Sequence, residues 1–348
     1  MGVTASLPPK ESGPDPAAVA PEPDALSRLA TLLDSDIAAC NRAIVARMDS
    51  PVALIPQLAA HIVAAGGKRL RPLLTLAAAH LCGYAGGARH VHLAACVEFI
   101  HTATLLHDDV VDESQLRRGL ASANAVFGNK ASVLVGDFLF ARAFQLMVED
   151  GSLVVLEILS RAAATIAEGE VLQLSTQNDL STDEARYLDV IRGKTAALFA
   201  AACEVGAVIA DRPAVEGRAL SSYGMALGIA FQLVDDALDY AADQAVLGKT
   251  VGDDFREGKV TLPVLAAYHA GDAAERAFWQ RTIEASEQTD ADLTQALRLV
   301  AERGAIEATL RRAAGFAAEA KRALELFPDS EVRRSLMAVA DYTVSRVR

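Results

Sequence analysis

The stretch FIHTATLLHDDVVD, residues 99–112, is an apolar helical run that ends in three aspartates, and MALGIAFQLVDDALD, residues 225–239, repeats the pattern. Residues four apart stack on one face of a helix, so Asp108 lies beside Asp112, and the second cluster has the same spacing. Like charges this close destabilise each other unless a cation lies between them, and an all-oxygen set of carboxylates suits Mg²⁺. The two clusters therefore predict two acidic faces that hold divalent cations around one polyanion.

A solvated acidic helix end is the alternative interpretation of each cluster, because DD pairs are common. The apolar residues upstream argue against it, since helices of a protein core would direct their charged ends inward. The presence of a second copy argues further for a function.

Composition and spacing predict an all-α protein. The 348-residue chain is 52% apolar but only 5% aromatic, and Val and Ile do not cluster in the short alternating runs that mark strands. Residues 1–23 are rich in Pro and Ala without periodicity, which predicts a disordered lead. From residue 24 helical patterns follow one another without a break in composition. We therefore predict one helical domain over residues 24–348.

Charge and cysteine usage narrow the functional class. The net charge of −12 argues against a nucleic-acid partner, because no basic excess is present to neutralise phosphates. The four cysteines form no CxxC pair, which is typical of buried thiols in a reducing cytosol. The N-terminus lacks a signal-peptide core, and charged residues interrupt long apolar stretches. We expect a soluble, cytoplasmic protein with at most peripheral membrane contact.

Basic residues accompany the aspartates. The segment GGKRLRP, residues 66–72, places Lys68 and Arg71 behind two glycines, although such a segment alone is more simply a helix C-cap with solvated cations. Arg117 and Arg118 follow the first cluster directly. Because Lys and Arg bind phosphate oxygens, cations beside a metal-binding acidic face predict a bound diphosphate.

Further candidates surround the second cluster. Lys194 and Thr195 in RGKTAALF could reach a phosphate, although the P-loop pattern is absent. Lys249 and Lys259 lie in the loop after the second cluster, and Gln232 lies one turn before that cluster. Each lysine alone is more simply a surface residue. Together with the two acidic faces they predict a site for two diphosphates.

The histidines divide into two groups. His101 lies two turns before Asp108 on a similar helix face, so we expect it to line the same pocket. His90 and His92 resemble a metal-binding pair, but an isolated HxH without a third ligand is more simply structural or exposed.

The order of the motifs is as informative as each motif. GGKRLRP, HDDVVDESQLRRG, GKTAALF, FQLVDDALD and GDDFREGKVTLPV follow one another over residues 66–264. With these five, the chain resembles the trans-isoprenyl diphosphate synthases, the polyprenyl synthase family, and the resemblance covers nearly everything from about residue 30 to the C-terminus. The resemblance implies long antiparallel helices around a deep central cavity, the isoprenoid synthase fold, and a homodimer. It also implies a Mg²⁺-dependent prenyltransferase that elongates an allylic diphosphate by successive head-to-tail condensation with isopentenyl diphosphate.

The resemblance also assigns roles to residues. It implies about three Mg²⁺ ions per site. The implied metal ligands are Asp108, Asp112, Asp235 and Asp239. The implied catalytic residues are Asp108, Asp109, Asp112, Asp235, Asp236 and Lys194. The residues implied for isopentenyl diphosphate are Lys68, Arg71, His101 and Arg118. Those implied for the allylic diphosphate are Arg117, Lys194, Thr195, Gln232, Lys249 and Lys259.

Product length is expected to follow the depth of the cavity. Short-chain members of the family place bulky residues just upstream of the first cluster, where this chain has Ala103 and Thr104. The floor is then expected lower, at Phe140, Phe144 or Met147. We therefore expect an all-trans product of roughly eight to ten isoprene units, suited to the side chain of a quinone such as ubiquinone.

Three alternatives remain. The first is a shorter-chain synthase, making farnesyl or geranylgeranyl diphosphate, although the first cluster lacks the two-residue insertion common in short-chain bacterial farnesyl synthases. A terpene cyclase shares the fold and first cluster, but its second metal site is normally an Asn/Ser/Glu arrangement and it would not need GGKRLRP. A non-catalytic partner subunit would be expected to have lost some of these aspartates or basic residues, and this chain retains them.

Overall fold

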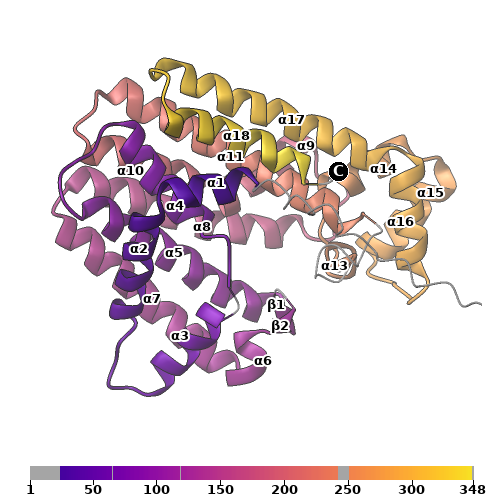
Figure 1. The fold of residues 1–348 in the computed structure, drawn as a ribbon. Coiled ribbons are helices and arrows are strands. Elements are labelled where there is room, and N and C mark those ends of the chain that lie inside the picture. The colour runs from indigo at the N-terminus through magenta and orange to yellow at the C-terminus, as the bar shows by residue number, and fades with distance from the viewer. Residues whose placement is uncertain (1–23, 65, 118, 242–250, 347–348) are drawn as a thin grey trace, which may run out of the picture.

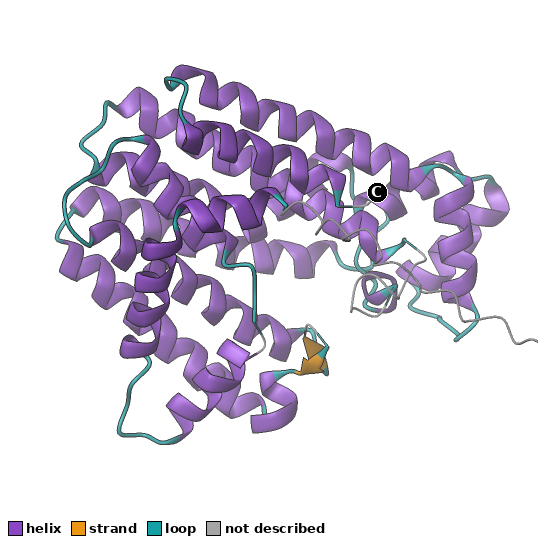
Figure 2. Ribbon diagram, in the orientation of Figure 1, coloured by secondary structure: helices purple, strands orange, loops and turns teal. Residues whose placement is uncertain are grey.

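The computed structural model describes residues 24–64, 66–117, 119–241 and 251–346, and the prediction for residues 1–23 therefore lies outside it. The expected all-α architecture is confirmed (Figures 1 and 2). Among the described residues the strands are β1 (Leu116–Arg117) and β2 (Leu120–Ala121), which form a small antiparallel hairpin.

The helices follow one another through the chain. The first half contains α1 (Ala25–Leu32), α2 (Asp34–Arg47), α3 (Leu54–Ala64), α4 (Leu70–Leu81), α5 (Arg89–Val111), α6 (Ala123–Phe127), α7 (Asn129–Asp150) and α8 (Leu153–Thr176). The middle contains α9 (Glu184–Ile191), the π-helical segment η1 (Arg192–Ala196), α10 (Ala197–Ile209) and α11 (Ala214–Asp239). The last part contains α13 (Asp253–Arg256), α14 (Leu262–Ala270), α15 (Ala273–Trp279), η2 (Gln280–Glu284), α16 (Asp292–Glu302), α17 (Ala305–Ala323), η3 (Leu324–Leu326) and α18 (Glu331–Ser345).

The core lies where α5, α10 and α11 are surrounded by other helices. The sequence of α10, ALFAAACEVGAVI, is apolar on nearly every side, and most of it is buried, as expected for a central helix. α11 packs between α10 and α17, while α5 packs on α7 and α4 (Figure 1). The two aspartate clusters therefore lie at the ends of two helices that are themselves held in the core.

Small residues let α11 approach α10 closely. A Cβ atom added to Gly224 would lie 2.3 Å from the carbonyl oxygen of Phe199, and one added to Gly228 would lie 2.6 Å from the Cα atom of Ala196. Because neither contact can be relieved by a side-chain rotation, these two glycines set the distance of the second cluster from η1.

One expected helix is interrupted. The sequence predicts a continuous helix through residues 182–210, but η1 inserts a wider π-helical turn that carries Lys194 and Thr195. In this turn Gly193 packs against Gly169 of α8, where an added Cβ on Gly193 would lie 3.0 Å from the Cα atom of Gly169. Such π-helical turns are frequent at functional sites because they redirect side chains.

α7 is less buried than the sequence suggests. Its apolar residues predict a helix buried nearly all round, but Leu134, Phe144 and Val148 are 67%, 45% and 68% exposed. Among the described helices α7 is also the one long and apolar enough to cross a membrane, contrary to the expectation that charges interrupt every such stretch. Because its other face packs along α5, α7 has the character of a core helix with one open apolar face.

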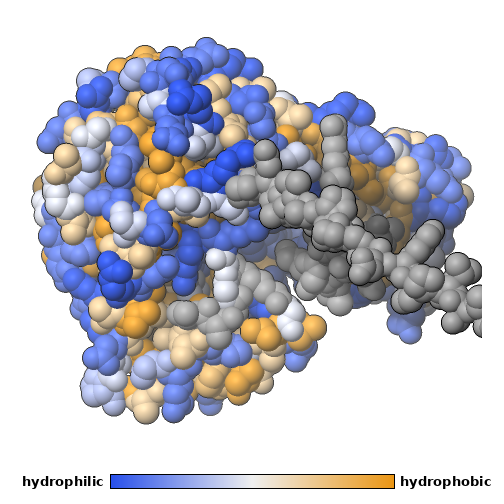
Figure 3. Space-filling model, viewed as in Figure 1, coloured by the Kyte–Doolittle hydropathy of each residue, from blue (hydrophilic) through white to orange (hydrophobic). Residues whose placement is uncertain are grey.

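A second apolar region lies on the face seen in Figure 3. Its side chains gather at the lower edge, over α6 and the β-hairpin. Leu116, Leu120 and Val126 belong to it, with exposed fractions of 61%, 44% and 51%.

Candidate active site

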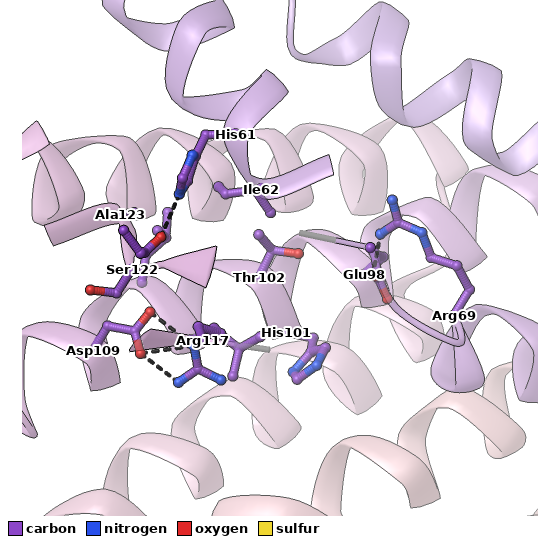
Figure 4. A pocket seen from close by; sticks show the side chains of 14 residues that line it. His61, Ile62, Arg69, Glu98, His101, Thr102, Asp109, Arg117, Ser122 and Ala123 are labelled. Atoms are coloured by element: carbon purple, nitrogen blue, oxygen red, sulfur yellow. Dashed lines mark hydrogen bonds and ion pairs between the residues drawn. The ribbon is translucent and has the colours of Figure 1, made fainter. Parts of the chain in front are cut away.

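The first cluster lies at the C-terminal end of α5. Asp109 is 2% exposed, and Arg117 of the β-hairpin donates to it through Nε, 2.8 Å from Oδ1, and through Nη2, 2.5 Å from Oδ1 (Figure 4). The amide of Asn124 donates to the backbone carbonyl of Asp109 at 3.0 Å. Asp109 therefore anchors the hairpin, whereas Asp108 and Asp112 retain side-chain exposures of 15% and 22%.

Two lysines from the second half of the chain face this cluster. Lys194 of η1 lies with Nζ 3.9 Å from Oδ2 of Asp108 and 2.7 Å from Oε2 of Glu170. Lys259, in the segment after α13, lies 3.2 Å from Oδ2 of Asp112. Burial lowers the pKa of Lys259, but nearby carboxylates, that of Asp112 first, more than offset this and raise it above its usual value. Lys259 is therefore present as a cation.

In the second cluster the middle aspartate is again buried. Asp236, 4% exposed, accepts hydrogen bonds from Tyr187 at 2.5 Å and from the Gln232 amide at 2.7 Å. Gln232 in turn accepts from the Thr195 hydroxyl at 2.8 Å. The predicted residues Thr195, Gln232 and Asp236 thus form one hydrogen-bonded chain that joins α11 to η1.

The other two aspartates of the second cluster have different partners. Asp235 lies 3.2 Å from Nη2 of Arg346, whose guanidinium also lies over the ring of Phe231 at 4.3 Å. Asp239 accepts backbone hydrogen bonds from Asp253 at 3.3 Å and from Asp254 at 3.1 Å, so it holds the start of α13. Of this cluster, Asp235 is the carboxylate paired with a cationic side chain rather than with backbone or buried donors.

Negative charge accumulates in a poorly solvated space. Burial raises the pKa of Asp108, and burial together with the nearby Asp254 raises the pKa of Asp236 to about 8 and of Asp239 to about 7. Burial also raises the pKa of Glu170 to about 7, against the opposing effect of Lys194. A desolvated group of carboxylates favours protons or bound cations.

The side chains line two cavities. One, of about 100 Å³, is lined by residues between 173 and 261, among them Tyr187, Lys194, Thr195, Gln232, Asp236, Asp254 and Lys259. The other, of about 50 Å³, lies between α3, α5 and the hairpin and is lined by His61, Arg69, Glu98, His101, Asp109 and Arg117 among others (Figure 4).

The basic segment before α4 meets α5 and the C-terminal helix. Nη1 of Arg71 lies 2.9 Å from Nε2 of His101, and its guanidinium lies over Phe199 at 4.5 Å. Lys68 donates to the hydroxyl of Tyr342 at 3.1 Å. The structure therefore brings Arg71 and His101 together and places Lys68 against α18.

The remaining predicted residues are placed as follows. Arg118 and Lys249 lie outside the described residues. Ala103 on α5 and Met147 on α7 are buried, Thr104 and Phe140 are partly buried, and Phe140 stacks on His107 with ring centroids 6.1 Å apart. Phe144 lies on the open face of α7. The control of product length by these residues stays a prediction.

Four site residues are missing from the sequence predictions. Glu170 pairs with Lys194, Tyr187 donates to Asp236, Asp254 lines the larger cavity, and Arg346 pairs with Asp235. Asp254 lies in the recognised motif GDDFREGKV, which could have indicated it. Glu170, Tyr187 and Arg346 carry no local signal, because their partners are distant in sequence.

Asp108, Asp112 and Asp235 fit Mg²⁺. Their ligands are carboxylate oxygens, which this ion prefers. Each of the three carboxylates lies within 4 Å of a lysine or arginine nitrogen, so each already has a cationic side chain beside it. A divalent cation would stabilise the charged form of the buried Asp108 in the same way.

An all-α bundle in which two aspartate clusters and several cations lie around two cavities is the architecture of an enzyme acting on diphosphates. The family model described as polyprenyl synthetase matches residues 52–300, and the chain belongs to this family.

Several proteins are similar to this chain along nearly its whole length. Octaprenyl diphosphate synthase of Escherichia coli (strain K12) is 49% identical, over 93% of this chain and 99% of that one. A decaprenyl diphosphate synthase structure from Rhodobacter capsulatus is 57% identical, with a TM-score of 0.89 over 93% and 99%. A polyprenyl synthase from Caulobacter crescentus CB15, complexed with calcium and isoprenyl diphosphate, is 56% identical, with a TM-score of 0.89 over 92% and 97%. The predicted family and fold are confirmed.

Proposed function

We propose that this protein is a trans-polyprenyl diphosphate synthase that elongates an allylic diphosphate with isopentenyl diphosphate, in successive head-to-tail steps, to a long-chain product. One observation carries the proposal. Lys259, which follows the second aspartate cluster, forms an ion pair with Asp112 of the first at 3.2 Å. Because Lys259 lines the larger cavity together with Asp236, this ion pair links Asp112 to that cavity, and it supports a single bound diphosphate between the two clusters.

The allylic diphosphate is assigned to this space. Mg²⁺, held by Asp108, Asp112 and Asp235, would neutralise charge on the leaving diphosphate. Lys194 and Lys259 are fixed at its edge by their carboxylate partners, so their ammonium groups can exchange part of that pairing for phosphate oxygens. Asp109 and Asp236 act indirectly, since they hold the hairpin and the η1 turn in place.

Isopentenyl diphosphate is assigned to Lys68, Arg71 and His101, with Arg118. Arg71 and His101 are already in contact. A diphosphate placed beside them would accept charge-assisted hydrogen bonds from the Arg71 guanidinium. The allylic C–O bond breaks with its electron pair on the leaving oxygen. The terminal double-bond carbon of isopentenyl diphosphate attacks the allylic cation, and a proton is lost to the departing diphosphate.

A product of roughly eight to ten isoprene units is supported by the small Ala103 and Thr104 just upstream of the first cluster. The naming of similar chains as octaprenyl and decaprenyl diphosphate synthases also supports it. We assign the product to the side chain of a quinone such as ubiquinone, made in the cytoplasm. A homodimer is supported by the open apolar face of α7.

The test is product analysis with the purified chain alone. Labelled isopentenyl diphosphate, farnesyl diphosphate and Mg²⁺ are incubated, and the products are separated by chain length. A long-chain diphosphate is expected, and chelation of Mg²⁺ should abolish it. Elongation that stops at farnesyl or geranylgeranyl diphosphate would favour the shorter-chain alternative. A hydrocarbon would indicate a cyclase, and activity only with a second chain would indicate a partner subunit.

A further inference from the structure

Three metal-ligating side chains meet far from the active site. They come from Asp36 in the first turn of α2, His80 in the last turn of α4, and His90 in the first turn of α5. One ligand atom of each lies within 4.8 Å of the other two. His90 is separated from Asp108 by 18 positions of one helix, or about 27 Å at the rise of an α-helix.

The distances are close to those of a metal site. Ligands of a tetrahedral zinc ion, bound at about 2.0–2.1 Å, lie roughly 3.4 Å apart. Nε2 of His90 lies 3.5 Å from Oδ2 of Asp36, which matches this spacing. Nε2 of His80 lies 2.5 Å from the same oxygen and would need to withdraw by about 1 Å. Its side chain is 40% exposed, so it can move and leave room for water.

The position of His90 also suits a metal ligand. A charged imidazole in the first turn of a helix is disfavoured by the positive end of the helix dipole. Burial lowers the pKa of His90, although Asp36 acts in the opposite direction. Its Nδ1 atom is buried without a hydrogen-bond partner among the described residues. Burial opposes ionisation of Asp36, but the His80 hydrogen bond and the two imidazoles hold the pKa of Asp36 below its usual value.

We propose that Asp36, His80 and His90 form a site for a divalent transition metal of the zinc class, with water completing the coordination. Two imidazoles and one carboxylate suit Zn²⁺ or Co²⁺, whereas Mg²⁺ prefers all-oxygen ligands. The ion would join α2 to the adjoining ends of α4 and α5. Its role is structural, because none of its ligands borders the cavities of the active site.

The first experiment uses Co²⁺ as a spectroscopic probe. The full-length protein is titrated with Co²⁺ in the presence of excess Mg²⁺, which occupies the aspartate clusters. Visible absorption bands of four- or five-coordinate Co²⁺ are expected at one ion per chain, and Zn²⁺ should displace them. His80→Gln and His90→Gln should each weaken binding at least tenfold. His92→Gln, an exposed histidine two positions from His90, serves as the matched control and should bind as the parent does.

Prenyl transfer with Mg²⁺ reports whether each variant is folded, and Asp108→Ala shows whether the active site contributes to the bands. Parent-like bands in His80→Gln and His90→Gln, or bands lost in Asp108→Ala, would overturn the proposal. If the histidine variants do not fold, the proposal is tested instead by mapping histidine acylation in the parent protein with and without Zn²⁺. Zn²⁺ should protect His80 and His90 but not His92, and equal reactivity with and without Zn²⁺ would contradict the site.

Discussion

Asp109 and Asp236 occupy the same place in their clusters, and both are buried and held by donors of the protein. Arg117 donates hydrogen bonds to Asp109, and Tyr187 donates one to Asp236. The first aspartate of each cluster is different, because Asp108 faces the ammonium of Lys194 while the second-cluster equivalent faces Arg346. The repeated motif therefore separates two tasks, because its first residue pairs with a cationic side chain and its second anchors a neighbouring segment.

Replacement of a first-position aspartate tests the metal assignment. Asp108→Ala or Asp235→Ala should lower turnover by two orders of magnitude or more, because a carboxylate ligand of the cation is lost. The far-ultraviolet circular dichroism spectrum should be unchanged, since neither residue is fully buried. Asp329→Ala, at a side chain 67% exposed, is the control. Parent-level turnover in the two site variants would remove these residues from the site.

Replacement of Tyr187 by Phe tests the anchoring role of a second-position aspartate. The change removes the hydroxyl that donates to Asp236 and leaves a buried carboxylate oxygen short of a donor. The free energy of unfolding should fall by about 1–3 kcal/mol, measured by denaturant titration. Tyr268→Phe, at a half-buried tyrosine outside the site, should change it little. Equal stability of both variants would mean that the Tyr187 hydroxyl does not support Asp236.

At the scale of elements, helix spacing positions the chemistry. Gly224 and Gly228 let α11 lie against α10 and η1, so that Gln232 can reach Thr195. A Gly224→Ala methyl would press on the Phe199 carbonyl and should destabilise the fold by about 3 kcal/mol. The matched control is Gly315→Ala at an exposed position of α17, where an added Cβ meets nothing within 4 Å. That change should raise the free energy of unfolding by up to about 1 kcal/mol, because alanine favours a helix more than glycine does. Comparable unfolding midpoints for the two variants would contradict this account of α11.

Helical periodicity and the aspartate motifs were sufficient to predict the all-α fold and the elements that carry the clusters. The π-helical turn at Lys194 was not predictable, because it depends on the contact of Gly193 with Gly169 of another helix. The same holds for Glu170 and Arg346, whose roles arise only when distant helices pack together. Sequence patterns predict the type of each element and which of its side chains are polar or charged. The partners of those side chains depend on how distant elements pack together.

The predicted product channel, expected to run from Ala103 and Thr104 toward α7, is tested by adding bulk at its start. Ala103→Phe should shorten the product, measured by chromatography of the labelled polyprenyl diphosphates. Because Ala103 is fully buried, overpacking could cost about 1–3 kcal/mol. Thr104→Phe, at a half-buried position on the face of Asp108, is the companion variant. Ala→Phe at the exposed Ala314 of α17 is the control. Products of parent length from both site variants would place the channel elsewhere.

At the scale of the whole molecule, the open face of α7 is the feature that a single chain does not explain. Leu134, Phe144 and Val148 form a stripe of exposed apolar side chains on a helix whose opposite face packs against α5. A second copy of the chain that packs on this stripe would bury it. It would also place Phe144, a candidate for the cavity floor, at the boundary between two subunits.

A charge placed in this stripe tests the homodimer. Leu134→Glu or Val148→Glu should shift the protein from dimer to monomer in analytical ultracentrifugation, because an unpaired carboxylate buried at an interface costs several kcal/mol. Val215→Glu, at another exposed apolar residue on α11, should leave the mass unchanged. If Phe144 closes the channel from the subunit boundary, the monomeric variants that remain active should also yield altered product lengths. A parent protein that sediments as a monomer, or stripe variants that stay dimeric, would show that the α7 face does not hold two copies together.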